Sequence, residues 1–145
     1  MVKIQISQED MARIKAAVRE VHVEERKQDR KRESNKAFYR MKKIMESYAD
    51  LKRFLETETE QAAEPDKIQT AILVHRVEKA MDELAAEYKS KGIGYQFEAF
   101  RLHYVCGKPY EDIAEELGSG KNSPAMWSKK VIRRMAVKIL GANGI

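Results

Sequence analysis

The residues with the clearest chemistry are six cations near the end of the sequence, which holds no carboxylate after Glu116. The last 29 residues contain all six, whereas the preceding 116 contain 22 basic and 23 acidic residues. Four of the six fall on one side of a predicted helix, opposite its apolar residues: Lys129, Lys130, Arg133 and Arg134. Cations without neighbouring carboxylates favour phosphate, so this pattern indicates a contact with nucleic acid.

A shorter helix and a turn must position these cations. The pattern Ile-Ala-x-x-Leu-Gly over residues 113–118 predicts a short helix whose small alanine allows a close crossing. Gly118 permits the positive φ of a turn. Ser123 and Pro124 predict an N-cap followed by proline at the first helical position. A short helix, a turn and a basic amphipathic helix indicate a helix-turn-helix, whose second helix enters the major groove of double-stranded DNA.

We expect the DNA contacts to lie in the turn and on the exposed side of the helix Ser123–Leu140. The candidate residues are Lys121, Asn122, Ser123, Met126, Lys129, Lys130, Arg133 and Arg134. The predicted turn is roughly three residues longer than in the common pattern of this motif. The alternative interpretation is a pair of packed helices with a solvated basic face.

A second basic stretch, residues 26–43, holds nine Lys or Arg side chains against two carboxylates. Such a run is typical of a solvated helical face. The alternative is a secondary contact with the DNA backbone or with an acidic partner, through Arg30, Lys31, Arg32, Lys36 and Arg40. Phe38 falls within the run, but its spacing to Met41 and Met45 predicts that it belongs to the core.

Other chemistry finds little support in the sequence. His103 and Cys106 are spaced for one helical face but are too few for a zinc site, so we expect a buried core cysteine and no metal. We also expect no catalytic residues, no cofactor and no enzymatic activity. One cysteine, no signal-peptide pattern and no apolar run of about 18 residues predict a cytoplasmic protein without a membrane segment.

Helix-forming residues dominate, so the predicted fold class is all-α, with an N-terminal helical arm or hairpin and a C-terminal helix-turn-helix bundle. The N-terminal region, residues 1–56, begins with a Ser7 cap and carries two apolar stripes, Met11–Val21 and Phe38–Leu55. Between them, residues 24–36 form either a solvated charged helix or a bend. Residues 57–66 are an acidic linker, 67–94 a central helix and 95–145 the DNA-binding domain.

Two family resemblances rest on these motifs. Tyr95–Leu140 resembles the region 4 helix-turn-helix of sigma factors, through the sequence of residues 100–105 followed by that of residues 110–118. The whole chain resembles the ArpU family of phage and prophage transcriptional regulators, through Lys31–Lys43 with the segment after it, the helix near Ile68–Tyr88 and the C-terminal motif. The ArpU resemblance implies a sequence-specific DNA-binding regulator of late phage genes.

Two other functions remain open from the sequence. One is a small terminase-like subunit for DNA packaging, which also joins a helix-turn-helix to oligomerising helices. The other is a sigma-like or anti-sigma-like module that contacts RNA polymerase with its basic tail. A single helix-turn-helix usually binds too loosely to be selective, so the sequence favours a homodimer.

Overall fold

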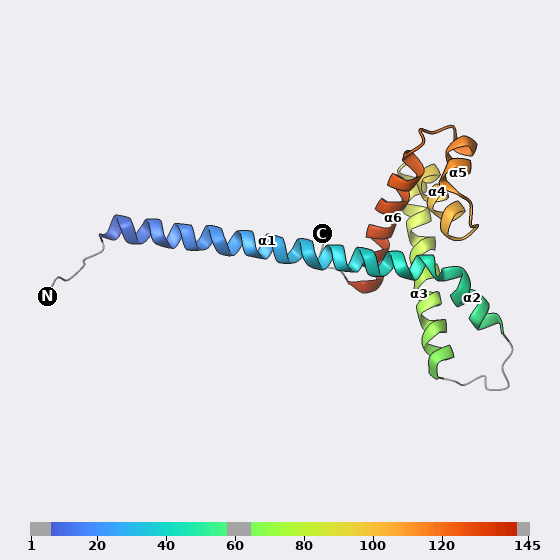
Figure 1. Cartoon of the computed structure of the whole chain (residues 1–145), viewed down its shortest axis with the longest axis horizontal. Coiled ribbons are helices and arrows are strands. Elements are labelled where there is room, and N and C mark those ends of the chain that lie inside the picture. The colour runs from blue at the N-terminus through green and yellow to red at the C-terminus, as the bar shows by residue number, and fades with distance from the viewer. Residues whose placement is uncertain (1–6, 58–64, 142–145) are drawn as a thin grey trace.

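The protein is helical throughout the computed structural model, which describes residues 7–57 and 65–141. Over these two ranges there are six helices and no strand, which confirms the all-α fold class. The helices are α1 (Gln8–Glu46), α2 (Tyr48–Glu56), α3 (Pro65–Ser90), α4 (Gly94–Tyr104), α5 (Tyr110–Leu117) and α6 (Ser123–Leu140). Figure 1 shows a helical body formed by α2 to α6 and the end of α1, from which the rest of α1 projects.

The first helix begins at the predicted cap and continues through the charged stretch that follows. Ser7 is the N-cap, and its Oγ accepts a hydrogen bond of 3.1 Å from the backbone N–H of Asp10. Residues 24–36 are helical, because they contain no glycine or proline and because their side chains pair along the helix. Of the two alternatives for this stretch, the charged helix is therefore correct and the bend is wrong.

The N-terminal part of α1 lies outside the body. Every residue from Gln8 to Glu33 is exposed, and we call this segment the arm. At 1.5 Å per residue the arm is about 39 Å long. Its apolar stripe consists of Met11, Ile14, Val18 and Val21, whose exposed fractions lie between 43% and 56%. The first predicted stripe is thus on one helix but takes no part in the core.

The second apolar stripe is divided between α1 and α2. Ser47 separates the two helices, and its backbone N–H donates to the carbonyl of Lys43 at 3.1 Å. The buried members of the stripe lie on both sides of this turn: Phe38, Met41, Met45 and Tyr48. The Tyr48 hydroxyl and the Lys52 ammonium both donate to Glu78, at 3.3 and 3.1 Å, and so join α2 to α3.

The central helix, α3, starts at Pro65, two residues before the predicted start. Proline suits this position because its fixed φ matches a helix and the first turn needs no donor from it. The helix ends at Ser90, and Gly92 follows with a φ of +75°. Of the predicted linker 57–66, residues 58–64 lie outside the residues that the structure describes.

Two apolar clusters hold the body together. The larger cluster joins α1, α2, α3, α4 and α6 and includes Met41, Leu84, Phe100 and Ile132. The smaller cluster lies under α5 and consists of Ala99, Leu102 and Ile113, with Tyr110, Leu117 and Trp127 against it. Because α6 contributes to both clusters, its position relative to α1, α3, α4 and α5 is fixed by packing along its length.

Candidate nucleic-acid interface

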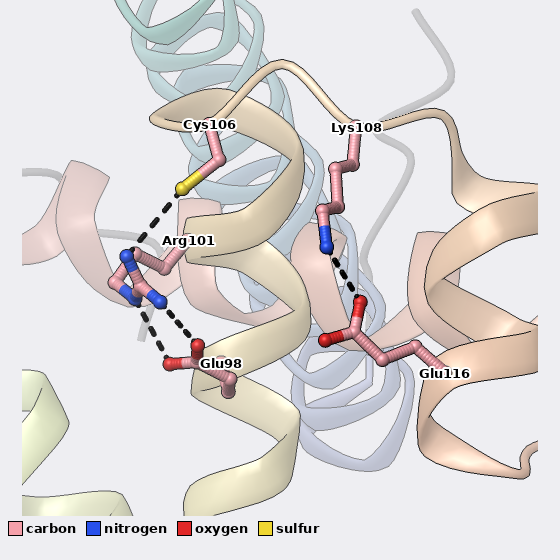
Figure 2. Close-up of polar contacts among 5 residues, drawn as sticks. All are labelled: Glu98, Arg101, Cys106, Lys108 and Glu116. Atoms are coloured by element: carbon pink, nitrogen blue, oxygen red, sulfur yellow. Dashed lines mark hydrogen bonds and ion pairs between the residues drawn. The ribbon is translucent and has the colours of Figure 1, made fainter.

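Contacts at both ends of α5 fix its position against α4. At its start, the imidazole of His103 stacks on the ring of Tyr110, with 3.8 Å between the ring centroids. In the loop, His103 Nδ1 lies 2.8 Å from the carbonyl oxygen of Lys108. Figure 2 shows the Lys108 ammonium reaching from this loop to the Glu116 carboxylate near the end of α5, at 2.8 Å. These contacts orient the first helix of the predicted helix-turn-helix.

Cys106 lies in the same loop, and its exposed thiol shows that the prediction of a buried core cysteine is wrong. The prediction placed Cys106 on the same helical face as His103, but α4 ends at Tyr104, so the cysteine lies beyond the helix and not on its buried side. Its Sγ accepts a hydrogen bond of 3.4 Å from Arg101, which also pairs with Glu98 (Figure 2). Hydrogen bonds from Arg101 lower the pKa of Glu98 below its ordinary value.

The order of short helix, left-handed turn and basic helix is as predicted. Ile113 and Ala114 are buried where α5 meets its neighbours. Gly118 has a φ of +64°, and a Cβ added there would meet nothing within 4 Å. The backbone conformation, and not the available space, therefore calls for glycine at this turn. Residues 118–122 connect the two helices.

The start of α6 differs in one respect from the prediction. The residue before the helix is Asn122, with αR backbone angles, and no side chain caps the first amides. The prediction of Ser123 as the N-cap is therefore wrong, because Ser123 is already the first residue of the helix and is half-buried. Pro124 is buried within the first turn, where its fixed φ supports the helix.

The two sides of α6 have different environments. One side is buried against α1, α3 and α4 and carries Val131, Ile132 and Met135, as predicted. The other side and the preceding turn expose five of the eight candidate residues without an ion pair to any residue in the described ranges: Lys121, Asn122, Met126, Lys129 and Lys130. This exposed set lies in the N-terminal half of the helix and in the turn.

Of the other three candidates, Ser123 is half-buried at the start of α6, and Arg133 and Arg134 have partners within the protein. Arg134 points to α3, where its Nη2 lies 3.2 Å from the Glu87 carboxylate. Two hydrogen bonds lower the pKa of Glu87 below its ordinary value, and the bond from Lys138 has a larger effect than the bond from Arg134. The Arg133 guanidinium carbon lies 4.6 Å from the centroid of the Phe38 ring on α1, a cation–π geometry that leaves its outer edge exposed.

The structure adds one candidate that the sequence reasoning missed. Lys42 of α1 and Lys129 of α6 line the same pocket of about 280 Å³, together with Phe38, His103 and one carboxylate, Glu46. Lys42 belongs to the basic stretch 26–43, but no pattern in the sequence related that stretch to α6. The crossing of α1 over α6 therefore joins the two basic segments into one surface.

The secondary basic candidates are all exposed but do not act as one group. Arg32, Lys36 and Arg40 follow one another at four-residue intervals, so they share a face of α1. Arg30 and Lys31 project from other sides of the same helix. Only Lys36 and Arg40 lie beyond the arm, near the crossing with α6.

The described ranges contain no cluster of three or more His, Cys, Asp or Glu side chains arranged to hold a metal ion. None of the helices described between residues 7 and 141 is long and apolar enough to cross a membrane. Comparisons of the chain with protein-family models, with curated proteins and with solved structures return no match.

Proposed function

We propose that the protein is a sequence-specific DNA-binding transcriptional regulator that reads the major groove with the N-terminal half of α6. The observation that carries the proposal is the exposed set Lys121, Asn122, Met126, Lys129 and Lys130, presented by a helix fixed from behind by packing. A rigid helix of this kind fits a major groove about 12 Å wide.

The side chains of this set suit contacts with base edges as well as contacts with phosphates. An asparagine side chain can form two hydrogen bonds with adenine, and a lysine can donate to the acceptors of guanine. We assign Asn122, Met126 and Lys130 to base edges, because they lie in the turn or on the outermost side of α6. Lys129 and Arg133 lie towards α1 and are assigned to phosphates.

The charges on the neighbouring helices support this orientation of the duplex. The outer surface of α5 exposes four carboxylates, Glu111, Asp112, Glu115 and Glu116. Glu116 is paired with Lys108, and the other three repel phosphates. The end of α1, which crosses α6, exposes three cations, Lys36, Arg40 and Lys43, beside one carboxylate, Glu46. The DNA backbone therefore finds a favourable surface along the α1–α6 crossing and an unfavourable one along α5.

The resemblance to the ArpU family gives the proposal its biological setting. On that basis the regulated genes are late phage or prophage genes, the partners are double-stranded DNA and RNA polymerase, and the protein acts in the bacterial cytoplasm. A homodimer would place two copies of α6 on half-sites one turn of DNA apart, about 34–36 Å.

Fluorescence anisotropy with a labelled duplex tests the proposal through variants on opposite sides of α6. Replacing Lys130 by alanine should weaken affinity roughly tenfold if it contacts a base. Replacing Lys129 should reduce the slope of log affinity against log salt by about 0.9, the value of one phosphate contact. Arg134→Ala is the matched control, because it removes the same charge from the same helix but from the side that faces Glu87.

Wild-type protein that binds no duplex at low salt would contradict the proposal. So would Lys129→Ala and Lys130→Ala variants that bind as tightly as the wild type and with the same salt dependence. If Arg134→Ala alone weakened binding, the DNA would have to approach α6 from the α3 side.

A further inference from the structure

The apolar stripe on the arm has no partner among the described residues of its own chain. Met11, Ile14, Val18 and Val21 are each about half exposed, and the arm extends away from the body in Figure 1. The second stripe does not cover them, since Phe38, Met41 and Met45 are already buried against the body. Folding of one copy therefore leaves a helical apolar stripe in solvent, where an isolated helix is only marginally stable.

We propose that the arm pairs with the arm of a second copy of this chain, as a short parallel coiled coil over residues 8–24. The four apolar residues follow a 3-4-3 spacing, so they occupy successive a and d positions of two heptads. The next positions in the same register hold Glu25, Gln28 and Arg32. Glu25 would face Glu25 and Arg32 would face Arg32, with the polar Gln28 between them, so the pairing ends after Val21 and the two helices diverge.

Charge complementarity selects the parallel orientation. In a parallel pair, Asp10 at a g position lies opposite Lys15 at the following e position of the other copy. In the antiparallel pair that buries the whole stripe, Lys15 would lie opposite Lys15, and Asp10 opposite Glu24. Only the parallel arrangement therefore places opposite charges beside the apolar seam.

The charges of the arm also favour a protein partner over a lipid surface. Helices that lie on membranes carry lysine and arginine on their polar face and bind anionic lipids. Residues 8–24 instead contain three basic residues and four acidic ones, so their net charge is negative. A second copy of the arm supplies an apolar seam of the same length together with the matching charges.

The pairing does not depend on DNA binding, but it has a consequence for it. Between Val21 and Phe38, each helix extends unpaired for about 26 Å before it reaches its body. Two diverging helices of this length let the bodies separate far enough to occupy half-sites about 34–36 Å apart.

Disulfide crosslinking of the full-length protein tests the register without DNA. The native thiol is removed by Cys106→Ser, a change in an exposed loop. In that background, Ile14→Cys places a thiol at a d position, where parallel pairing brings it against its own counterpart. Ala16→Cys is the matched control, because it lies on the opposite side of the same exposed helix. We expect mild oxidation to link Ile14→Cys chains several-fold more than Ala16→Cys chains.

Sedimentation of the wild type and of Val18→Glu gives the second measurement. The substitution places a carboxylate in the seam, and the body should stay folded because residue 18 does not touch it. We expect the wild type to associate with increasing concentration and Val18→Glu to remain monomeric. A dimer or a trimer would support the proposal, since β-branched residues at d positions also suit parallel trimers. A wild type that stays monomeric, or equal crosslinking of the two cysteine variants, would overturn it.

Discussion

Replacing Phe38 by alanine should detach the end of α1 from α6 and destabilise the body. Phe38 is 3% exposed, belongs to the larger cluster and lies beneath the guanidinium of Arg133. Truncation of a buried phenylalanine costs about 3–5 kcal/mol, because the apolar contacts are lost and a cavity remains. An exposed cation–π pair supplies about 0.5–1 kcal/mol of that total.

Urea unfolding followed by tryptophan fluorescence measures this loss directly. Trp127 is the one tryptophan of the chain and packs against the smaller cluster, so its emission reports on the body and not on the arm. Phe38→Leu keeps most of the apolar side chain and loses the aromatic ring, so we expect a smaller loss of about 1–2 kcal/mol.

Tyr39→Ala is the matched control for this experiment. Tyr39 is the next residue on α1 and is 64% exposed. Its ring meets the ring of Phe38 edge to face at 5.3 Å, so its truncation should lower the free energy of unfolding by about 1 kcal/mol at most. If Phe38→Ala unfolded at the same urea concentration as Tyr39→Ala, α1 would not pack on α6 in solution. The assignment of the α1–α6 crossing as one basic surface would then be refuted.

Three further predictions follow from the same structure. Ile113→Ala should lower the free energy of unfolding by about 2–5 kcal/mol in the same urea assay, because Ile113 is fully buried. Leu117→Ala should lower the free energy of unfolding by less, because Leu117 is only half-buried. The pKa of Glu87 is lowered in the folded state. The ionised carboxylate therefore stabilises the fold above its unfolded pKa, and this stabilisation is lost as the pH falls through the folded pKa. Glu87→Gln should reduce the difference in melting temperature between neutral and acidic pH. The thiol of Cys106 should react with a thiol reagent in the native protein as fast as in urea, whereas strong protection in the native state would mean that the loop after α4 is closed.

Features that depend on neighbouring residues could be predicted from the sequence. The Ser7 cap and the left-handed Gly118 each follow from a side chain and a few adjacent positions, whereas the cap predicted at Ser123 does not form. The periodicity of α6 likewise separated its buried side from its basic side correctly. These features are local because helix formation and capping depend on contacts three or four residues apart.

The sequence could not predict which charges remain free. Arg133 and Arg134 are adjacent and looked equivalent, but about 100° of helical rotation separates them. One therefore lies on Phe38 of α1 and the other on Glu87 of α3, 95 and 47 residues away in the chain. The same limit explains Cys106, whose exposure depends on where α4 ends and not on the apolar residues before it.

Residues close together in the sequence were enough to predict an all-helical chain with a basic C-terminal helix, a turn that requires glycine and an apolar stripe near the N-terminus. The packing of the helices settled which stripe is buried and which remains on an exposed arm, because burial depends on which surfaces meet. It also placed the basic end of α1 beside α6, so that two separate charge runs became one surface. Periodicity specifies the faces of each helix, but long-range packing specifies their partners.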